Sequence, residues 1–122
     1  MISLNAEQAI HSFWSSFNLT AYDQNSVPDD AVLPYITYSV SYDSFDNNVS
    51  LTASAWDESY SWLRLTQVAN AIDSYIGKTK MIRTDNGGIR ITKGSPFYQR
   101  TGTEKDTVKR IYFNVRAEYI QD

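Results

Sequence analysis

The only histidine in the sequence, His11, is the side chain best suited to act as a general base towards a serine or threonine nucleophile. It follows Ile10 in a segment with helical spacing and falls toward the polar flank of that helix. This position is typical of a surface or boundary histidine, and no nucleophile–base–carboxylate set is indicated. Cysteine is absent, which excludes disulfides, cysteine zinc sites and thiol catalysis.

Clustered carboxylates offer the remaining routes to chemistry. A turn containing Asp43, Asp46, Asn47 and Asn48 could supply oxygens to calcium, but it lacks the regular acidic spacing and the closing glutamate of a calcium loop. The adjacent acids at 29–30 and 57–58 could act on a sugar, but sequence neighbours rarely converge on one bond. No glycine pattern of a phosphate-binding loop occurs. We therefore expect no metal, no cofactor and no enzymatic activity.

Charge is divided unevenly along the chain. Residues 1–63 contain eight acids and no lysine or arginine, whereas residues 64–122 contain all eleven cations and six acids, so the halves carry −8 and +5 within a net charge of −3. The halves could neutralise each other inside one domain. Alternatively, an acidic face of one copy meets a basic face of the next, and such a head-to-tail contact closes into a ring or grows into a filament.

Size and composition set the class of protein. A chain of 122 residues has enough surface to bury for one core, so we expect one domain over residues 1–122. The negative net charge argues against a general nucleic-acid-binding protein, which would need a largely positive surface. The apolar runs are short, and the first residues lack the basic segment followed by an apolar segment that is typical of a signal peptide. These features predict a soluble, cytoplasmically made and unprocessed protein.

Hydrophobic periodicity predicts the elements. We expect a helix over residues 5–17, a loop over 18–34 with a short extended piece at 20–22, a hairpin of strands 35–42 and 49–56, and a second helix ending at Gly77. The motif Asp85-Asn86-Gly87 then predicts a hairpin over 80–93 with little core to contribute, followed by a loop over 94–107. The fold class is α+β: an antiparallel sheet with two helices packed on one face and a protruding β-hairpin, in the order α-β-β-α-β-β-β.

The last segment alternates most clearly and predicts a strand over residues 109–120. At about 3.3 Å per residue this strand could reach about 40 Å. A compact domain of this size is about 35 Å across. The strand must therefore bend or overhang, and an overhanging strand could extend a neighbour's sheet through its unpaired edge.

Aromatic residues are abundant, with three tryptophans, nine tyrosines and five phenylalanines. Six of them gather in the region of the first hairpin and second helix: Tyr35, Tyr38, Tyr42, Trp56, Tyr60 and Trp62. Such residues fill small cores and stabilise cross-strand pairs. Exposed, they could form a sugar-stacking platform or part of a protein interface.

The segment Val27-Pro28-Asp29-Asp30-Ala31-Val32-Leu33-Pro34-Tyr35-Ile36-Thr37-Tyr38, with a helix before it and Trp56 to Ile76 after it, resembles the small tail terminator (tail completion) proteins of long-tailed bacteriophages and related prophage particles. The resemblance implies an α+β subunit that forms a ring, commonly a hexamer, which caps the tail tube and joins it to the head connector. It implies a virion protein of the tail or neck, assembled in the bacterial host cytoplasm, with DNA only passing through the channel and no membrane partner.

This interpretation assigns two sets of contact residues. The expected contacts between subunits are Asp43, Asp46, Asp57, Glu58, Arg64, Lys109 and Arg116. The expected contacts with the tail tube or connector are Lys80, Arg83, Arg90, Lys93, Phe97, Tyr98 and Arg100. A head-completion or stopper subunit is the alternative within the class. A small carbohydrate-binding module is the alternative from another class, and a small hydrolase comes third.

Overall fold

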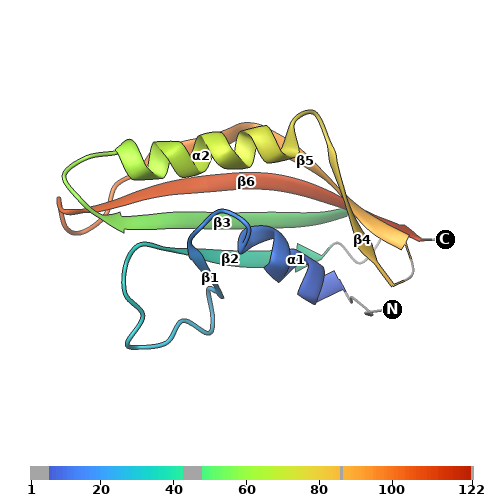
Figure 1. Cartoon of the computed structure of the whole chain (residues 1–122), viewed down its shortest axis with the longest axis horizontal. Helices are drawn as coiled ribbons and strands as arrows, with labels where there is room; N and C mark the ends of the chain where they lie inside the picture. The colour runs from blue at the N-terminus through green and yellow to red at the C-terminus, as the bar shows by residue number, and fades with distance from the viewer. Residues whose placement is uncertain (1–5, 43–47, 86, 122) are drawn as a thin grey trace.

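A computed structural model gives the fold of the chain and describes residues 6–42, 48–85 and 87–121. In chain order the elements are α1 (Ala6–Trp14), β1 (Thr20–Asp23), β2 (Tyr35–Tyr42), β3 (Asn48–Glu58), α2 (Leu63–Ile76), β4 (Lys80–Thr84), β5 (Gly87–Thr101) and β6 (Val108–Gln121). The strands form one curved layer, and both helices lie over the same side of it (Figure 1).

The six strands form one sheet in the order β1-β2-β3-β6-β5-β4. All neighbours are antiparallel except β1 and β2, which are parallel. The α+β class is therefore confirmed, while the element order is α-β-β-β-α-β-β-β because the short extended piece after α1 joins the sheet as β1. No helix in the described residues is both long enough and apolar enough to cross a bilayer.

Strand β6 lies in the middle of the sheet. Residues 108–118 pair with β3, and residues 110–113 and 115–121 pair with β5. The expectation that this strand offers unpaired backbone groups to a neighbouring sheet is therefore wrong over residues 110–113 and 115–118, which are paired on both sides.

Each helix buries one stripe of side chains against the sheet. In α1 the stripe contains Ala9, Ile10, Phe13 and Trp14, and the helix ends at Trp14, earlier than predicted. In α2 it contains Leu65, Val68, Ala69, Ile72 and Ile76. Gly77 ends α2 as predicted, with a φ of 60° that glycine adopts without a Cβ penalty. Ser61 Oγ accepts a hydrogen bond from the Leu63 amide at 3.0 Å at the start of this helix.

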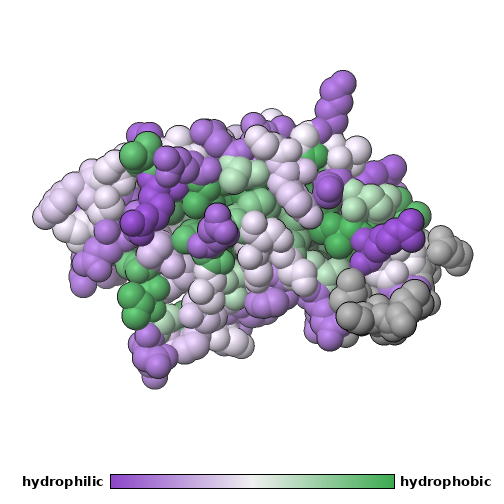
Figure 2. All heavy atoms as spheres, viewed as in Figure 1, coloured by the Kyte–Doolittle hydropathy of each residue, from purple (hydrophilic) through white to green (hydrophobic). Residues whose placement is uncertain are grey.

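The core lies between the helices and one face of the sheet. Alternate positions of β3 and β6 point into it, including Leu51, Ala53, Phe113 and Val115, which are almost fully buried. The small side chains of Ala53 and Ala55 are also buried on β3, the strand that α2 contacts. On the face that carries the helices, hydrophobic side chains are visible mainly between the two helices, and hydrophilic ones surround them (Figure 2).

The second hairpin corrects two predictions. Ile89 and Ile91 of β5 are fully buried, so the prediction that this hairpin contributes little to the core is wrong. Strand β5 also continues to Thr101, so the predicted loop is wrong for residues 94–101. The sequence hides this continuation because the ladder between β5 and β6 shifts register between Lys93 and Tyr98, which breaks the alternation of side chains.

Gly94 lies in this irregular part of β5, and we expect Gly94→Ala to destabilise the fold by about 1–3 kcal/mol. A Cβ at this position would come within 2.7 Å of the Asn114 side chain and 2.8 Å of its carbonyl oxygen. Gly102→Ala is the matched control, because no heavy atom lies within 4 Å of the added carbon. Urea unfolding of both variants measures the difference, and equal midpoints would contradict the close approach.

Candidate functional site

The sheet order places the two oppositely charged halves of the sequence at opposite edges. Strands β1, β2 and β3 come from the acidic half and form one side of the sheet, whereas β6, β5 and β4 come from the basic half and form the other side. The edges are five strand spacings apart, or about 24 Å along the sheet. Two charged surfaces result, and they approach each other where α1 contacts β4.

The acidic surface consists of Glu7 on α1, Asp23 at the end of β1, and Asp29 and Asp30 in the loop between β1 and β2, all of them exposed. This loop extends away from the sheet (Figure 1). Glu7 and Asp23 line a pocket of about 250 Å³ together with Tyr38. All four acids come from the part of the sequence before Arg64, which has no lysine or arginine. Arg110 of β6 lies beside the same loop, in a pocket that it shares with Gln24 and Val27.

His11, predicted to be a surface or boundary histidine, lies beside this surface and contacts two side chains. Its Nδ1 lies 3.0 Å from the Tyr38 hydroxyl, and its Nε2 lies 3.4 Å from Ser15 Oγ. Burial, followed by the charges of Asp23 and Glu7, raises the pKa of Tyr38 above its ordinary value of 10.0. The tyrosine therefore stays neutral at physiological pH, and the pair serves as a structural contact between α1 and β2.

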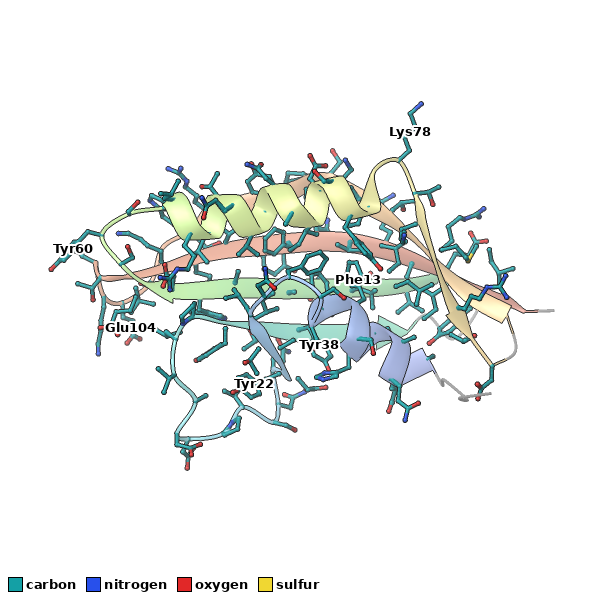
Figure 3. All side chains as sticks on the ribbon, viewed as in Figure 1. Phe13, Tyr22, Tyr38, Tyr60, Lys78 and Glu104 are labelled. Atoms are coloured by element: carbon teal, nitrogen blue, oxygen red, sulfur yellow. The ribbon has the colours of Figure 1, made fainter. Side chains whose placement is uncertain are left out.

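The basic surface lies on β4, on β5 and on the turn before β4. It consists of Lys78, Lys80, Arg83, Arg90, Lys93 and Arg100, with Asp85 as the one acid in the segment 77–101. Lys78 points away from the body of the molecule (Figure 3). The predicted tube or connector contacts all fall on these two neighbouring strands, including Phe97 and Tyr98, whose rings pack near Phe113 at 5.7 and 6.1 Å.

Four of the six cations have contacts within the chain. Arg90 Nη2 lies 2.9 Å from Glu118 Oε1, and Lys93 pairs with Asp73 on α2. Two more of these four cations lie over aromatic rings. The Lys80 ammonium lies 4.7 Å from the centroid of the Tyr75 ring, and the Arg100 guanidinium lies 4.6 Å from the centroid of the Trp62 ring.

Lys78 and Arg83 complete the basic surface. Both are exposed and take part in none of the described ion pairs. They are therefore the cations of this surface most available to a partner.

The two surfaces do not neutralise each other in the part of the chain that the structure describes. Its ion pairs are Asp57–Arg64, Glu118–Arg90 and Asp73–Lys93, and none joins the acidic surface to the basic one. Salt weakens the interaction between exposed charges that lie more than about 8 Å apart at physiological ionic strength. The two surfaces come nearest where α1, which carries Glu7, contacts β4. Each surface therefore presents its own sign of charge to solvent.

In the described part of the chain, the predicted subunit contacts lie mostly at one end of the sheet, where Asp57 is directly opposite Lys109 on the neighbouring strand, and only Arg116 lies apart from this end. Asp57 is buried, and its carboxylate lies 3.3 Å from Arg64 Nη1 within the same chain. Lys109 donates to the Asp106 carbonyl oxygen, whereas Glu58 and Arg116 are exposed. Asp43 and Asp46 lie outside the described residues, as does the calcium-like turn that contains them. Across the described ranges there is no group of three side chains suited to hold a metal.

The six predicted aromatic residues do not form a common stacking platform among the described residues. Tyr38 is buried, Tyr60 is exposed at one end of the molecule (Figure 3), and the side chain of Tyr42 lies outside the described set. The rings of Trp56 and Trp62 are each covered by an arginine, at 4.7 and 4.6 Å. A sugar ring would have to displace these cations, so the arrangement does not favour the carbohydrate-binding alternative.

Arg110 is a candidate that the sequence analysis missed. It lies on β6 directly opposite Trp56 of β3, on the face of the sheet away from the helices, and lines a pocket of about 300 Å³. Its guanidinium lies 4.7 Å from the Trp56 centroid, and its Nε donates to Ser54 Oγ at 2.9 Å. The alternation of side chains along each strand predicts that Arg110 and Trp56 face away from the core. The pairing of β3 with β6, which brings them together, depends on residues far apart in the sequence and cannot be predicted from local patterns.

Comparisons with known proteins show a likeness of fold to a virion protein chain. No family model matches the chain, and no curated protein sequence is significantly similar to it. A chain of a solved structure described as "Virion of native gene transfer agent (GTA) particle" has a similar fold, with a TM-score of 0.52 and 16% sequence identity. The alignment covers 93% of this chain and 85% of that chain. At this level of identity the likeness is one of fold.

Proposed function

We propose that this chain is a structural protein of a phage-type virion, and specifically a tail terminator that caps the tail tube and joins it to the head connector. The fold shared with a chain of a gene transfer agent virion supports the virion class. The resemblance of residues 27–38 to tail terminator proteins supports the specific role. The protein acts through shape and charge complementarity and not as an enzyme.

The observation that carries the proposal is that one subunit presents an acidic and a basic surface that no described ion pair joins. Identical copies docked by such unlike surfaces make a head-to-tail contact, which closes into a ring when the rotation between copies allows it. Complementary charges speed the encounter and fix the register of the contact. The proposed partners are other copies of the chain in a ring, the tail tube protein and the head connector, with DNA only passing through the channel.

Sedimentation velocity of the purified chain over a range of concentrations tests the self-association, and negative-stain microscopy tests its form. We expect a discrete closed ring. A monomer at all concentrations, with and without isolated tail tubes, would contradict the proposal.

The neck role has its own test. Particles assembled without the protein are expected to leave filled heads and finished tails unjoined, and adding the purified protein back is expected to join them. Normal particles in its absence would remove the proposed role even if rings form.

A further inference from the structure

The pocket around Arg110 lies on the sheet face that the helices leave uncovered. It is lined by residues of β2, β3, β6 and the loop after β1: Gln24, Val27, Tyr35, Thr37, Thr52, Ala53, Ser54, Trp56, Arg110 and Tyr112. All of these residues except Arg110 are neutral. The pocket therefore has one positive charge and no acid of its own to balance it.

The neighbours of Arg110 hold its guanidinium in one orientation. One flat side faces the Trp56 ring at 4.7 Å, and the Tyr112 ring lies 5.9 Å away. The Trp56 ring is itself fixed by the hydrogen bond from its Nε1 to Thr37 Oγ1, at 2.9 Å. The Ser54 hydroxyl that accepts from Arg110 Nε belongs to a buried residue.

The remaining donors of Arg110 are available. Its hydrogen bond to Ser54 uses Nε, its two terminal nitrogens have no acceptor among the described residues, and it takes part in none of their ion pairs. An oriented guanidinium presents parallel N–H groups that match the two oxygens of a carboxylate. Pre-orientation also lowers the entropy cost of binding.

We propose that this pocket receives the carboxylate of a single aspartate or glutamate side chain, flanked by neutral residues, from another protein chain. A pocket of about 300 Å³ accommodates one side chain, and Val27 and Tyr35 supply apolar contact for its stem. The loop that forms one wall follows Asp23 and carries Asp29 and Asp30, so it repels a densely charged nucleic acid far more than a single carboxylate. The proposal does not depend on ring formation.

The test is an NMR titration of the ¹⁵N-labelled full chain with the blocked tripeptide acetyl-Ala-Glu-Ala-amide. We expect saturable shifts of the Trp56 indole N–H and the Arg110 Nε–H. The matched peptide with glutamine in place of glutamate is expected to bind at least tenfold more weakly, because it lacks the charge. Equal affinity for the two peptides would overturn the proposal.

Variants separate the shape of the guanidinium from its charge. Arg110→Gln and Arg110→Lys are each expected to weaken binding at least tenfold, since lysine keeps the charge but loses the paired donors. Ser54→Ala keeps the arginine and is expected to weaken binding severalfold. Arg116→Gln, on the same strand and the same face, is the control and is expected to bind as the unaltered chain does.

Two further results would overturn the proposal. One is unaltered binding by Arg110→Lys in a variant whose thermal unfolding midpoint matches that of the unaltered chain. The other is tighter binding of inorganic phosphate than of the glutamate peptide, which would make the pocket a general anion site.

Discussion

Reversing the two loop aspartates of the acidic surface, by Asp29→Lys with Asp30→Lys, is expected to weaken association between copies by about tenfold or more. Both side chains are exposed and belong to the acidic surface, so the change puts cations against the basic surface of the next copy. Like charges brought together at a contact cost several kcal/mol. Sedimentation velocity at physiological ionic strength measures the effect, which should diminish at high salt.

The basic surface offers the reciprocal change. Lys78→Glu with Arg83→Glu is expected to weaken association to a similar degree, and these two cations are chosen because both are exposed and neither takes part in a described ion pair or ring contact. Combining all four substitutions in one chain restores unlike charges at every contact. The combined variant is therefore expected to associate as the unaltered chain does.

A control variant distinguishes the effect of the changed net charge from the effect of where the charges lie. Glu104→Lys with Asp106→Lys changes the net charge by the same amount as the loop reversal, but in the exposed turn between β5 and β6. We expect no more than a small effect on association. If both reversals leave association unchanged, the contact between copies does not use these surfaces. Microscopy would then show whether the copies form a ring through other contacts.

Phe113→Ala is expected to lower the free energy of unfolding by about 3–5 kcal/mol. Phe113 is fully buried on the central strand β6, with the rings of Trp14 at 6.4 Å and Phe97 at 5.7 Å. It joins α1 to the irregular part of β5, and alanine would leave a cavity between three elements. Urea unfolding followed by circular dichroism measures the loss.

Two other substitutions calibrate that measurement. Phe113→Leu refills most of the volume and is expected to cost less than Phe113→Ala. Arg116→Ala, three residues further along the same strand and exposed, is expected to change stability by less than about 0.5 kcal/mol. A loss of under about 1 kcal/mol for Phe113→Ala would contradict the position of the ring at the centre of the core.

Local patterns predicted most elements of this fold. The apolar spacing of α1 and α2 and the alternation of β2, β3 and β6 are short-range signals, and each predicted an element that exists. The signal failed over residues 94–101, where Gly94 and Pro96 and a register shift interrupt alternation within a continuous strand. It also could not show that β1 pairs with β2 in parallel, because a four-residue strand has too few positions to establish a period.

The candidate site depended on a property that lies beyond local patterns. The charge asymmetry is plain in the sequence, but whether the halves interleave or separate depends on strand order, which links residues far apart in the chain. The same applies to Arg110 and Trp56, which are 54 positions apart in number and directly opposite in register. The sequence therefore predicted that the protein has charged surfaces, and the order of the strands in the sheet determines where these surfaces lie.

The central place of β6 also has a consequence for biosynthesis. Residues 108–121 are the last to leave the ribosome among the elements of this sheet, yet they lie between β3 and β5 and hold its two halves together. A nascent chain that stops short of them has two separate strand groups and no complete core, so folding is expected only after translation of this segment. Partial products are thus held back from assembly, because the acidic and basic edges reach their final positions only when the central strand joins them.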